Sequence, residues 1–310
     1  MIDLYCGVND TMWNHHPVNP GSLVCISPVY GSSARTKKEN NIRIPGHSLV
    51  FQDSGAFCDG PGERLSFSEA LERQISHSEK YSYTNQVSHR ASYDLLVDEK
   101  WEGKVRYKRR WSENDAWSAV KETIRAAEYM AKNYTGNKIL SAQGVTANQY
   151  LECAVRILEY FNPDSDIFGL GGWCIAGKMP LNIRPSFNAT MIKIIPFLAK
   201  ASVKKVHIWG VMDITFLGPL LWLCDQHGLK LSTDSSGPQV RPTRGEWGYR
   251  GWRNTAYKNA PVETRGIHRA LHVQLTRCWL KTICGTEFYH HPDMPDKKQN
   301  YLFNIGDFHV

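Results

Sequence analysis

Eight short apolar runs, most of them followed by an amphipathic stretch, limit what this chain can fold into. The amphipathic stretches begin after the third run and carry apolar residues at helical spacing. Strands that alternate with helices favour a parallel sheet, and eight of them favour a closed barrel. We therefore predict an α/β fold, a (β/α)8 barrel. The predicted strands are residues 2–6, 22–27, 48–52, 92–97, 138–142, 166–170, 205–209 and 230–233, and the predicted helices are 67–81, 114–133, 146–161, 185–201 and 215–227.

One domain is expected over the whole chain, residues 1–310. The sequence has no internal repeats, no low-complexity tracts and no stretch of linker composition. The first two connections read as irregular loops, and a long segment rich in Gly, Pro, Trp and Arg follows the last strand to about residue 258. A further helix is predicted at about 263–283, and residues 285–310 read as a polar C-terminal tail.

The composition is that of a chain that buries a large core. The 310 residues are 42% hydrophobic and 22% charged, and no apolar run approaches the ~20 residues of a membrane helix. The N-terminus lacks a secretory pattern, and the eight cysteines are scattered, which favours reduced thiols and a cytoplasmic location. The net charge of +7 is compatible with a polyanionic partner, as it is with many ordinary enzymes.

Polar or small residues stand where each of the last six predicted strands ends. The carboxyl ends of the strands in a parallel barrel meet on one face, so these residues should converge there. A single aspartate at such a position is as readily a helix cap as a catalyst. Three aspartates in register with a glutamine and a glycine pair favour a site. The residues are Asp53, Asp98, Gln143, Gly171 with Gly172, His207 with Gly210, and Asp234.

The order of these strings resembles that of the tRNA-guanine transglycosylase-like superfamily. The matching strings are Asp53-Ser54-Gly55, Asp98-Glu99, Gln143-Gly144, Gly171-Gly172, Asp234 and Pro242-Thr243-Arg244. The resemblance covers roughly residues 48–250. Because the chain is short and lacks the usual zinc motif, it is most similar to the 7-deazaguanine DNA-modification transglycosylases.

The resemblance implies a pentosyltransferase that works through a covalent aspartyl-nucleotide intermediate. Asp234 would attack the anomeric carbon, and Asp53 would protonate the departing guanine. Asp234 lies further from Arg244 than in the tRNA enzymes, so Asp213 and Asp225 are alternative nucleophiles. The residues implied in binding the substrate base are Asp98, Gln143, Gly171, Gly172, Trp173, Phe57 and Ser54.

No cofactor is expected. The zinc string Cys-x-Cys-x-x-Cys of the tRNA enzymes does not occur in this chain. Its C-terminal part has Cys278 and Cys284 near His272, His290 and His291, at a spacing that is not a standard one for zinc. An altered zinc site is the alternative to a Cys278 that simply packs within its helix.

Two basic and aromatic segments suggest contact with nucleic acid. Residues 101–111 and 240–258 interleave Lys and Arg with Trp and Tyr, a pattern that neutralises phosphates and stacks on bases. For the first segment, a hairpin packed on the barrel is an equal alternative. In the second, which follows Asp234, we expect backbone contacts from Arg241, Arg244, Arg250 and Arg253.

The sequence therefore predicts an enzyme that replaces guanine in DNA by a 7-deazaguanine such as 7-cyano-7-deazaguanine. The expected partners are nucleic acid, with DNA favoured over tRNA, and the free 7-deazaguanine base; no membrane partner is expected. A tRNA-guanine transglycosylase is the closest alternative. A glycoside hydrolase with two carboxylates is the second, because it too would place a carboxylate pair on a barrel.

Overall fold

A closed barrel of eight parallel strands forms the centre of the computed structural model, and the predicted (β/α)8 barrel is confirmed. The strands follow one another in chain order, and pairing of β1 with β8, from Ile2 opposite Leu231, closes the barrel. The structure describes residues 2–8, 23–29, 44, 46–56, 59, 64–95, 113–173, 180–212, 214–235, 246–247 and 252–253. The strands are β1 (Ile2–Val8), β2 (Leu23–Ile26), β3 (Leu49–Gln52), β4 (Val87–Ala91), β5 (Lys138–Ala142), β6 (Ile167–Leu170), β7 (Lys205–Ile208) and β8 (Lys230–Ser235).

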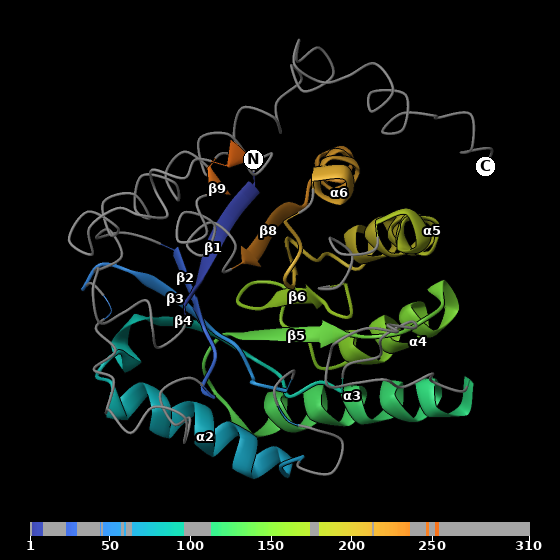
Figure 1. The fold of residues 1–310 in the computed structure, drawn as a ribbon. Helices are drawn as coiled ribbons and strands as arrows, with labels where there is room; N and C mark the ends of the chain where they lie inside the picture. Colours follow the sequence, from blue (N-terminus) through green and yellow to red (C-terminus); the bar gives the residue numbers. More distant parts are fainter. Residues whose placement is uncertain are drawn as a thin grey trace.

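Five long helices lie outside the barrel in the described residues (Figure 1). They connect β3 to β8 in turn, and a short 3-10 helix, η1 (Thr84–Gln86), leads into β4. Helix α2 begins with a capping box, in which the Ser66 hydroxyl accepts from the Glu69 N–H and the Glu69 side chain accepts from the Ser66 N–H. The helices are α2 (Phe67–Lys80), α3 (Glu113–Asn133), α4 (Ala147–Leu158), α5 (Pro180–Lys200) and α6 (Ile214–Gln226).

Two apolar layers hold these elements together. The larger one lies between the strands and the outer helices and includes the fully buried Ile157, Ile194 and Phe216. The smaller one takes one side chain from each of β1 to β6, and because side chains alternate across a strand, this second layer fills the barrel interior. Its members are Tyr5, Cys25, Phe51, Ala91, Ile139 and Ile167.

The predicted fourth strand, residues 92–97, is wrong, because β4 spans Val87–Ala91. This strand carries three polar side chains, and two of them, His89 and Arg90, are buried. His89 Nε2 is hydrogen-bonded to the Ser165 carbonyl at 3.1 Å, and burial lowers the His89 pKa to about 4. A search for apolar runs passes over such a strand, because its burial depends on hydrogen-bond partners from elsewhere in the chain.

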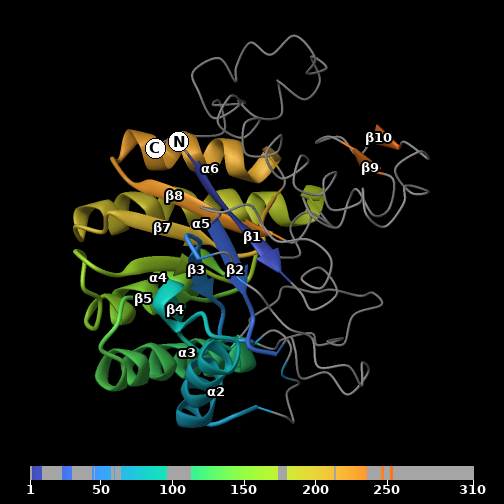
Figure 2. The same cartoon turned by 90° about the vertical axis from the view of Figure 1, so that its left-hand side faces the viewer.

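Other parts of the sequence prediction fall outside the described residues. These are the early loops, the segment 101–111, the helix at about 263–283 and the tail. Between 236 and 262 the structure describes only β9 (Glu246–Trp247) and β10 (Trp252–Arg253), an antiparallel pair seen apart from the barrel in Figure 2. No helix in the described part of the chain is both long and apolar enough to cross a bilayer.

Candidate active site

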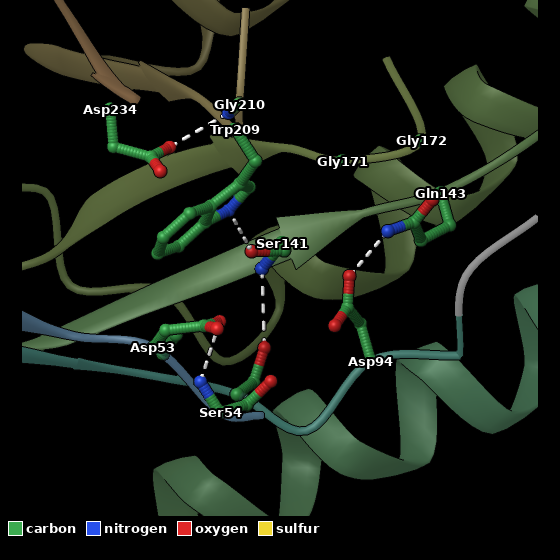
Figure 3. Close-up of a pocket in the computed structure, with 12 residues that line it drawn as sticks. Asp53, Ser54, Asp94, Ser141, Gln143, Gly171, Gly172, Trp209, Gly210 and Asp234 are labelled. Atoms are coloured by element: carbon green, nitrogen blue, oxygen red, sulfur yellow. Dashed lines mark hydrogen bonds between the residues drawn. The ribbon is translucent and has the colours of Figure 1, made fainter. Parts of the chain in front are cut away.

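Six of the predicted site residues line one pocket of about 170 Å³ at the carboxyl ends of the strands. Figure 3 shows Asp53 and Ser54 on one side, Asp234 on another, and the pair Asp94 and Gln143 on a third. The predicted residues found there are Asp53, Ser54, Gln143, Gly171, Gly172 and Asp234, and the pocket also takes Ala91, Ser92, Asp94, Ser141, Trp209 and Gly210.

Asp53 stands directly after β3, where its N–H donates to the Ile26 carbonyl of β2 at 2.8 Å. The Ser54 N–H donates to Oδ1 of the Asp53 carboxyl at 2.7 Å. Burial, together with the negative charges of Asp234 and Asp94, raises the Asp53 pKa to about 7. Near neutral pH this carboxyl therefore exists in both its protonated and its ionised form.

Asp234 lies within β8, and two groups from the β7 side fix its carboxylate. The Gly210 N–H donates to Oδ1 at 2.7 Å, and His207 Nε2 is hydrogen-bonded to the same oxygen at 3.3 Å. Gly210 has φ +69°, a left-handed conformation that favours glycine and turns its N–H toward the carboxylate. His207 is fully buried, and its Nδ1 meets the Ser232 hydroxyl at 2.9 Å. These contacts hold Asp234 in one orientation.

Asp94 and Gln143 form the third side of the pocket. Gln143 Nε2 donates to Asp94 Oδ2, and burial raises the pKa of the Asp94 carboxyl. Gly171 lies against this pair, and a Cβ at that position would overlap the Gln143 amide. Gln143 Oε1 is buried without a hydrogen-bond partner among the described residues. A bound molecule with a hydroxyl or N–H group would satisfy this acceptor.

Sequence reasoning missed several residues of the pocket wall. Asp94 takes the place expected for Asp98, because β4 ends earlier than predicted. Asp94 lies three residues after Ala91, and without the position of β4 the sequence offered no signal for it. Trp209 Nε1 donates to the Ser141 hydroxyl at 2.8 Å, which places an indole ring beside Asp234 (Figure 3). Neither Trp209 nor Ser141 belongs to a recognisable sequence string.

The remaining predicted site residues either do not line the pocket or lie outside the described part of the chain. Trp173 is buried and packs between Tyr150 and Phe187, with ring centroids 6.0 and 5.1 Å away. Asp225, the alternative nucleophile, lies in α6. Arg253 is described only as a backbone position of β10. Asp98, Phe57, Asp213, Arg241, Arg244 and Arg250 lie outside the described residues.

The described residues contain no group of three or more His, Cys, Asp and Glu side chains that could hold a metal ion. The cysteines and histidines of the alternative zinc site lie outside the described part of the chain. The expectation about zinc therefore stays a prediction, as does nucleic-acid binding by the four arginines.

The chain is similar to several solved barrel structures at low sequence identity. They include D-allulose 3-epimerase from Methylomonas sp. (15% identity, 89% of this chain and 99% of that one, TM-score 0.39). An L-ribulose 3-epimerase is a further example (14% identity, 94% of this chain and 100% of that one, TM-score 0.38). Another is D-psicose 3-epimerase from Clostridium cellulolyticum H10 (9% identity, 88% of this chain and 98% of that one, TM-score 0.42). No family model matches the chain, and no curated protein was found to match it. At these values the likeness carries no substrate over to this protein.

The expected membership of the tRNA-guanine transglycosylase-like superfamily is wrong. The similar structures named above are sugar epimerases, and no family model supports a transglycosylase. Guanine exchange in DNA, the 7-deazaguanine substrate, the pentosyltransferase class and the tRNA alternative fall with it. The physical reason is that parallel barrels build their sites at the same strand ends, so short polar strings recur there in unrelated proteins. The alternative of a glycoside hydrolase does not depend on this family and stays a prediction.

Proposed function

We propose that this protein is an enzyme that moves protons between carbon and oxygen atoms of a small hydroxylated carbonyl compound. The observation that carries the proposal is a pair of carboxyl groups, Asp53 and Asp234, that face one small pocket. The two groups are held differently, and such a difference in environment is how enzymes assign one carboxyl as acid and the other as base.

Asp53 is suited to the role of general acid. Its pKa of about 7 leaves the proton on about half of the molecules at neutral pH, the range in which proton transfer is most efficient. Asp234, oriented by Gly210 and His207, is suited to the role of base. In the forward step Asp234 takes the proton from the carbon next to the carbonyl, and Asp53 gives its proton to the carbonyl oxygen. The enediol so formed becomes the product when Asp53, now ionised, takes the proton of the neighbouring hydroxyl and Asp234 returns its proton to the former carbonyl carbon.

The pocket suits a substrate of about the size of one ring or a short chain. A cavity of about 150 Å³ accommodates a molecule such as benzene, and this pocket measures about 170 Å³. Its walls are hydrogen-bonding, and the unpartnered Gln143 Oε1 would accept from a substrate hydroxyl. The Asp94 carboxyl beside it adds a second polar group.

The test is proton exchange with solvent. Wild-type protein is incubated in heavy water with a panel of small aldoses, ketoses and other hydroxylated carbonyl compounds, and loss of each C–H signal is followed by NMR. At least one compound should exchange, and Asp53→Asn and Asp234→Asn should each slow that exchange by about 10²–10⁴-fold. Glu72→Gln, a change at an exposed carboxylate of α2, should not affect it. No exchange in the whole panel, or full exchange in both aspartate variants, would refute the proposal.

A cytoplasmic location is part of the proposal. Cys6, Cys25, Cys153 and Cys224 are buried and form no disulfide among the described residues, as expected in a reducing compartment. Fractionation of the host cell with an antibody to the protein should recover it with the cytoplasmic enzymes, and recovery in a secreted or periplasmic fraction would contradict this.

A further inference from the structure

One side chain of the outer helix layer bridges the ends of β3 and β4. The last register pair of these strands is Gln52 with Arg90, and the next residues are Asp53 and Ala91. Gln74 of α2 donates from Nε2 to the Asp53 carbonyl at 3.1 Å and to the Ala91 carbonyl at 3.0 Å. Both N–H bonds of the amide are thus used, and they take the place of a further rung between the two strands.

The orientation of the Gln74 amide is determined by its neighbours. Both of them are carbonyl oxygens, which only accept, so the amino group and not the oxygen must face them. Gln74 is buried, and its own main-chain carbonyl accepts from Gln52 Nε2 at 2.6 Å. Helix α2 and the end of β3 are therefore tied together in both directions.

The preceding residue of the helix holds the next carbonyl of the loop. Arg73 Nη2 donates to the Ser54 carbonyl at 2.8 Å, and the guanidinium also pairs with Asp59 at 2.8 Å. Gly55, at φ +80°, leaves room for this contact, because a Cβ there would lie 2.7 Å from Arg73 Nη2. Two successive carbonyls, those of Asp53 and Ser54, are thus held by two successive residues of α2.

We propose that Gln74 is a positioning residue for Asp53, whose main chain it holds against β4 so that the carboxyl faces Asp234 within the pocket. Gln74 is not among the residues that line the pocket, so it acts through the backbone of Asp53. The expected effect on catalysis rests on the proposed function. The expected effect on the Asp53 carboxyl does not.

The test is Gln74→Met, which keeps the length of the side chain and removes both donors. Once the loop can move, the Asp53 carboxyl becomes more exposed to water. Its titration midpoint, followed by carbon-13 NMR of the carboxyl, should then fall by one pH unit or more from about 7. Turnover of a substrate that exchanges should fall by about tenfold or more at little-changed KM, because misplacement of a catalytic group acts on the chemical step.

The matched control is Ser78→Ala, one turn further along α2. Ser78 is fully buried and accepts a hydrogen bond from Arg90 at 2.8 Å, but it does not contact Asp53. It should lose stability as Gln74→Met does and keep the wild-type midpoint of Asp53. A folded Gln74→Met protein with the wild-type midpoint would overturn the inference.

A second measurement uses the unaltered protein, in case Gln74→Met does not fold. NMR of isotope-labelled wild type should show scalar couplings across the hydrogen bonds from Gln74 Nε2 to the carbonyl carbons of Asp53 and Ala91. Their absence would overturn the inference. An unmoved midpoint together with an inactive Asp53→Asn variant would refute the role of Gln74 and leave the proposed function standing. A moved midpoint with a fully active Asp53→Asn variant would refute the function alone.

Discussion

The two sides of this barrel are held together by different forces. On the side of β5 to β8, helices α4, α5 and α6 pack through apolar side chains such as Ile157, Ile194 and Phe216, all fully buried. On the side of β3 and β4, helix α2 packs through buried polar groups. There Arg90 donates to Gln52, Ser78 and Tyr134, and Gln52 in turn donates to the Tyr83 hydroxyl.

The difference concerns what each kind of contact determines. Apolar burial contributes most of the stability of a domain but has little directional preference. A net hydrogen bond contributes only about 0.5–1.5 kcal/mol, yet it specifies the position of both partners. Asp53 and Asp94 follow β3 and β4, the two strands of the polar side. The part of the barrel that positions these two carboxyl groups is therefore the part built from directed contacts. Variants on the two sides should therefore differ in whether they change the stability of the fold or the position of the Asp53 carboxyl.

The largest effect on stability is expected on the apolar side. Phe216 is fully buried and packs edge-on against Phe187, with ring centroids 5.0 Å apart. Phe216→Ala should lower the free energy of unfolding by about 3–5 kcal/mol, measured by urea denaturation, because it leaves a cavity. The titration midpoint of Asp53 should not change. If it moves as far as in Gln74→Met, the two sides do not differ in the way described.

A smaller effect, of opposite sign, is expected at Asp53 itself. Its folded pKa of about 7 lies above the ordinary value of 3.8, so ionisation opposes folding, and stability is lost as the pH rises from about 4 through 7. Asp53→Asn removes this loss. At pH 8 the variant should be more stable than wild type by about 1–3 kcal/mol, a range reduced for the water that reaches this half-buried group.

Thermal melts of both proteins at several pH values check this prediction. Below pH 4 the difference between their melting temperatures should no longer depend on pH, because the Asp53 carboxyl is then protonated in both the folded and the unfolded state. A constant difference from pH 4 to pH 8 would show that the Asp53 pKa is not raised.

The smallest effects compare two left-handed glycines, one on each side. Gly55 has φ +80°, and a Cβ there would lie 2.7 Å from Arg73 Nη2 and 2.9 Å from Val29 Cγ1; Gly228, after α6, has φ +70° and open space around it. Gly228→Ala should lower the free energy of unfolding by about 1 kcal/mol, through backbone strain alone. Gly55→Ala should lower the free energy of unfolding by about 1 kcal/mol more, and it should also lower the titration midpoint of Asp53. Equal costs and an unchanged midpoint would mean that the Arg73 contact does not position the loop.

The same contrast explains which parts of the structure the sequence predicts. The strands β5 and β6 of the apolar side contain the apolar pairs Ile139-Leu140 and Ile167-Phe168, and the prediction for β5 matches its bounds at Lys138 and Ala142. Strand β4, with its His89 and Arg90, was misplaced, because its burial depends on partners such as Tyr134 that are 44 residues away from Arg90. The error moved the expected strand-end carboxylate from Asp94 to Asp98.

The site shows the same limit. Asp53, Gln143 and Asp234 were found because each directly follows or ends an apolar run, which is where a barrel gathers polar groups. Gln74 has no such signal, since its role lies in contacts between a helix and two strand ends. Short strings at strand ends predict where a site lies, and here they did not predict which chemistry it performs.

The central claim is that Asp53 and Asp234 act as a coupled pair across one pocket, and titration of the Asp53 carboxyl tests it most directly. Carbon-13 NMR should give a midpoint near 7 in the wild-type protein, and Asp234→Asn should lower that midpoint, because it removes a negative charge that raises the Asp53 pKa. A wild-type midpoint near the ordinary 3.8, or one that Asp234→Asn leaves unchanged, would contradict the claim.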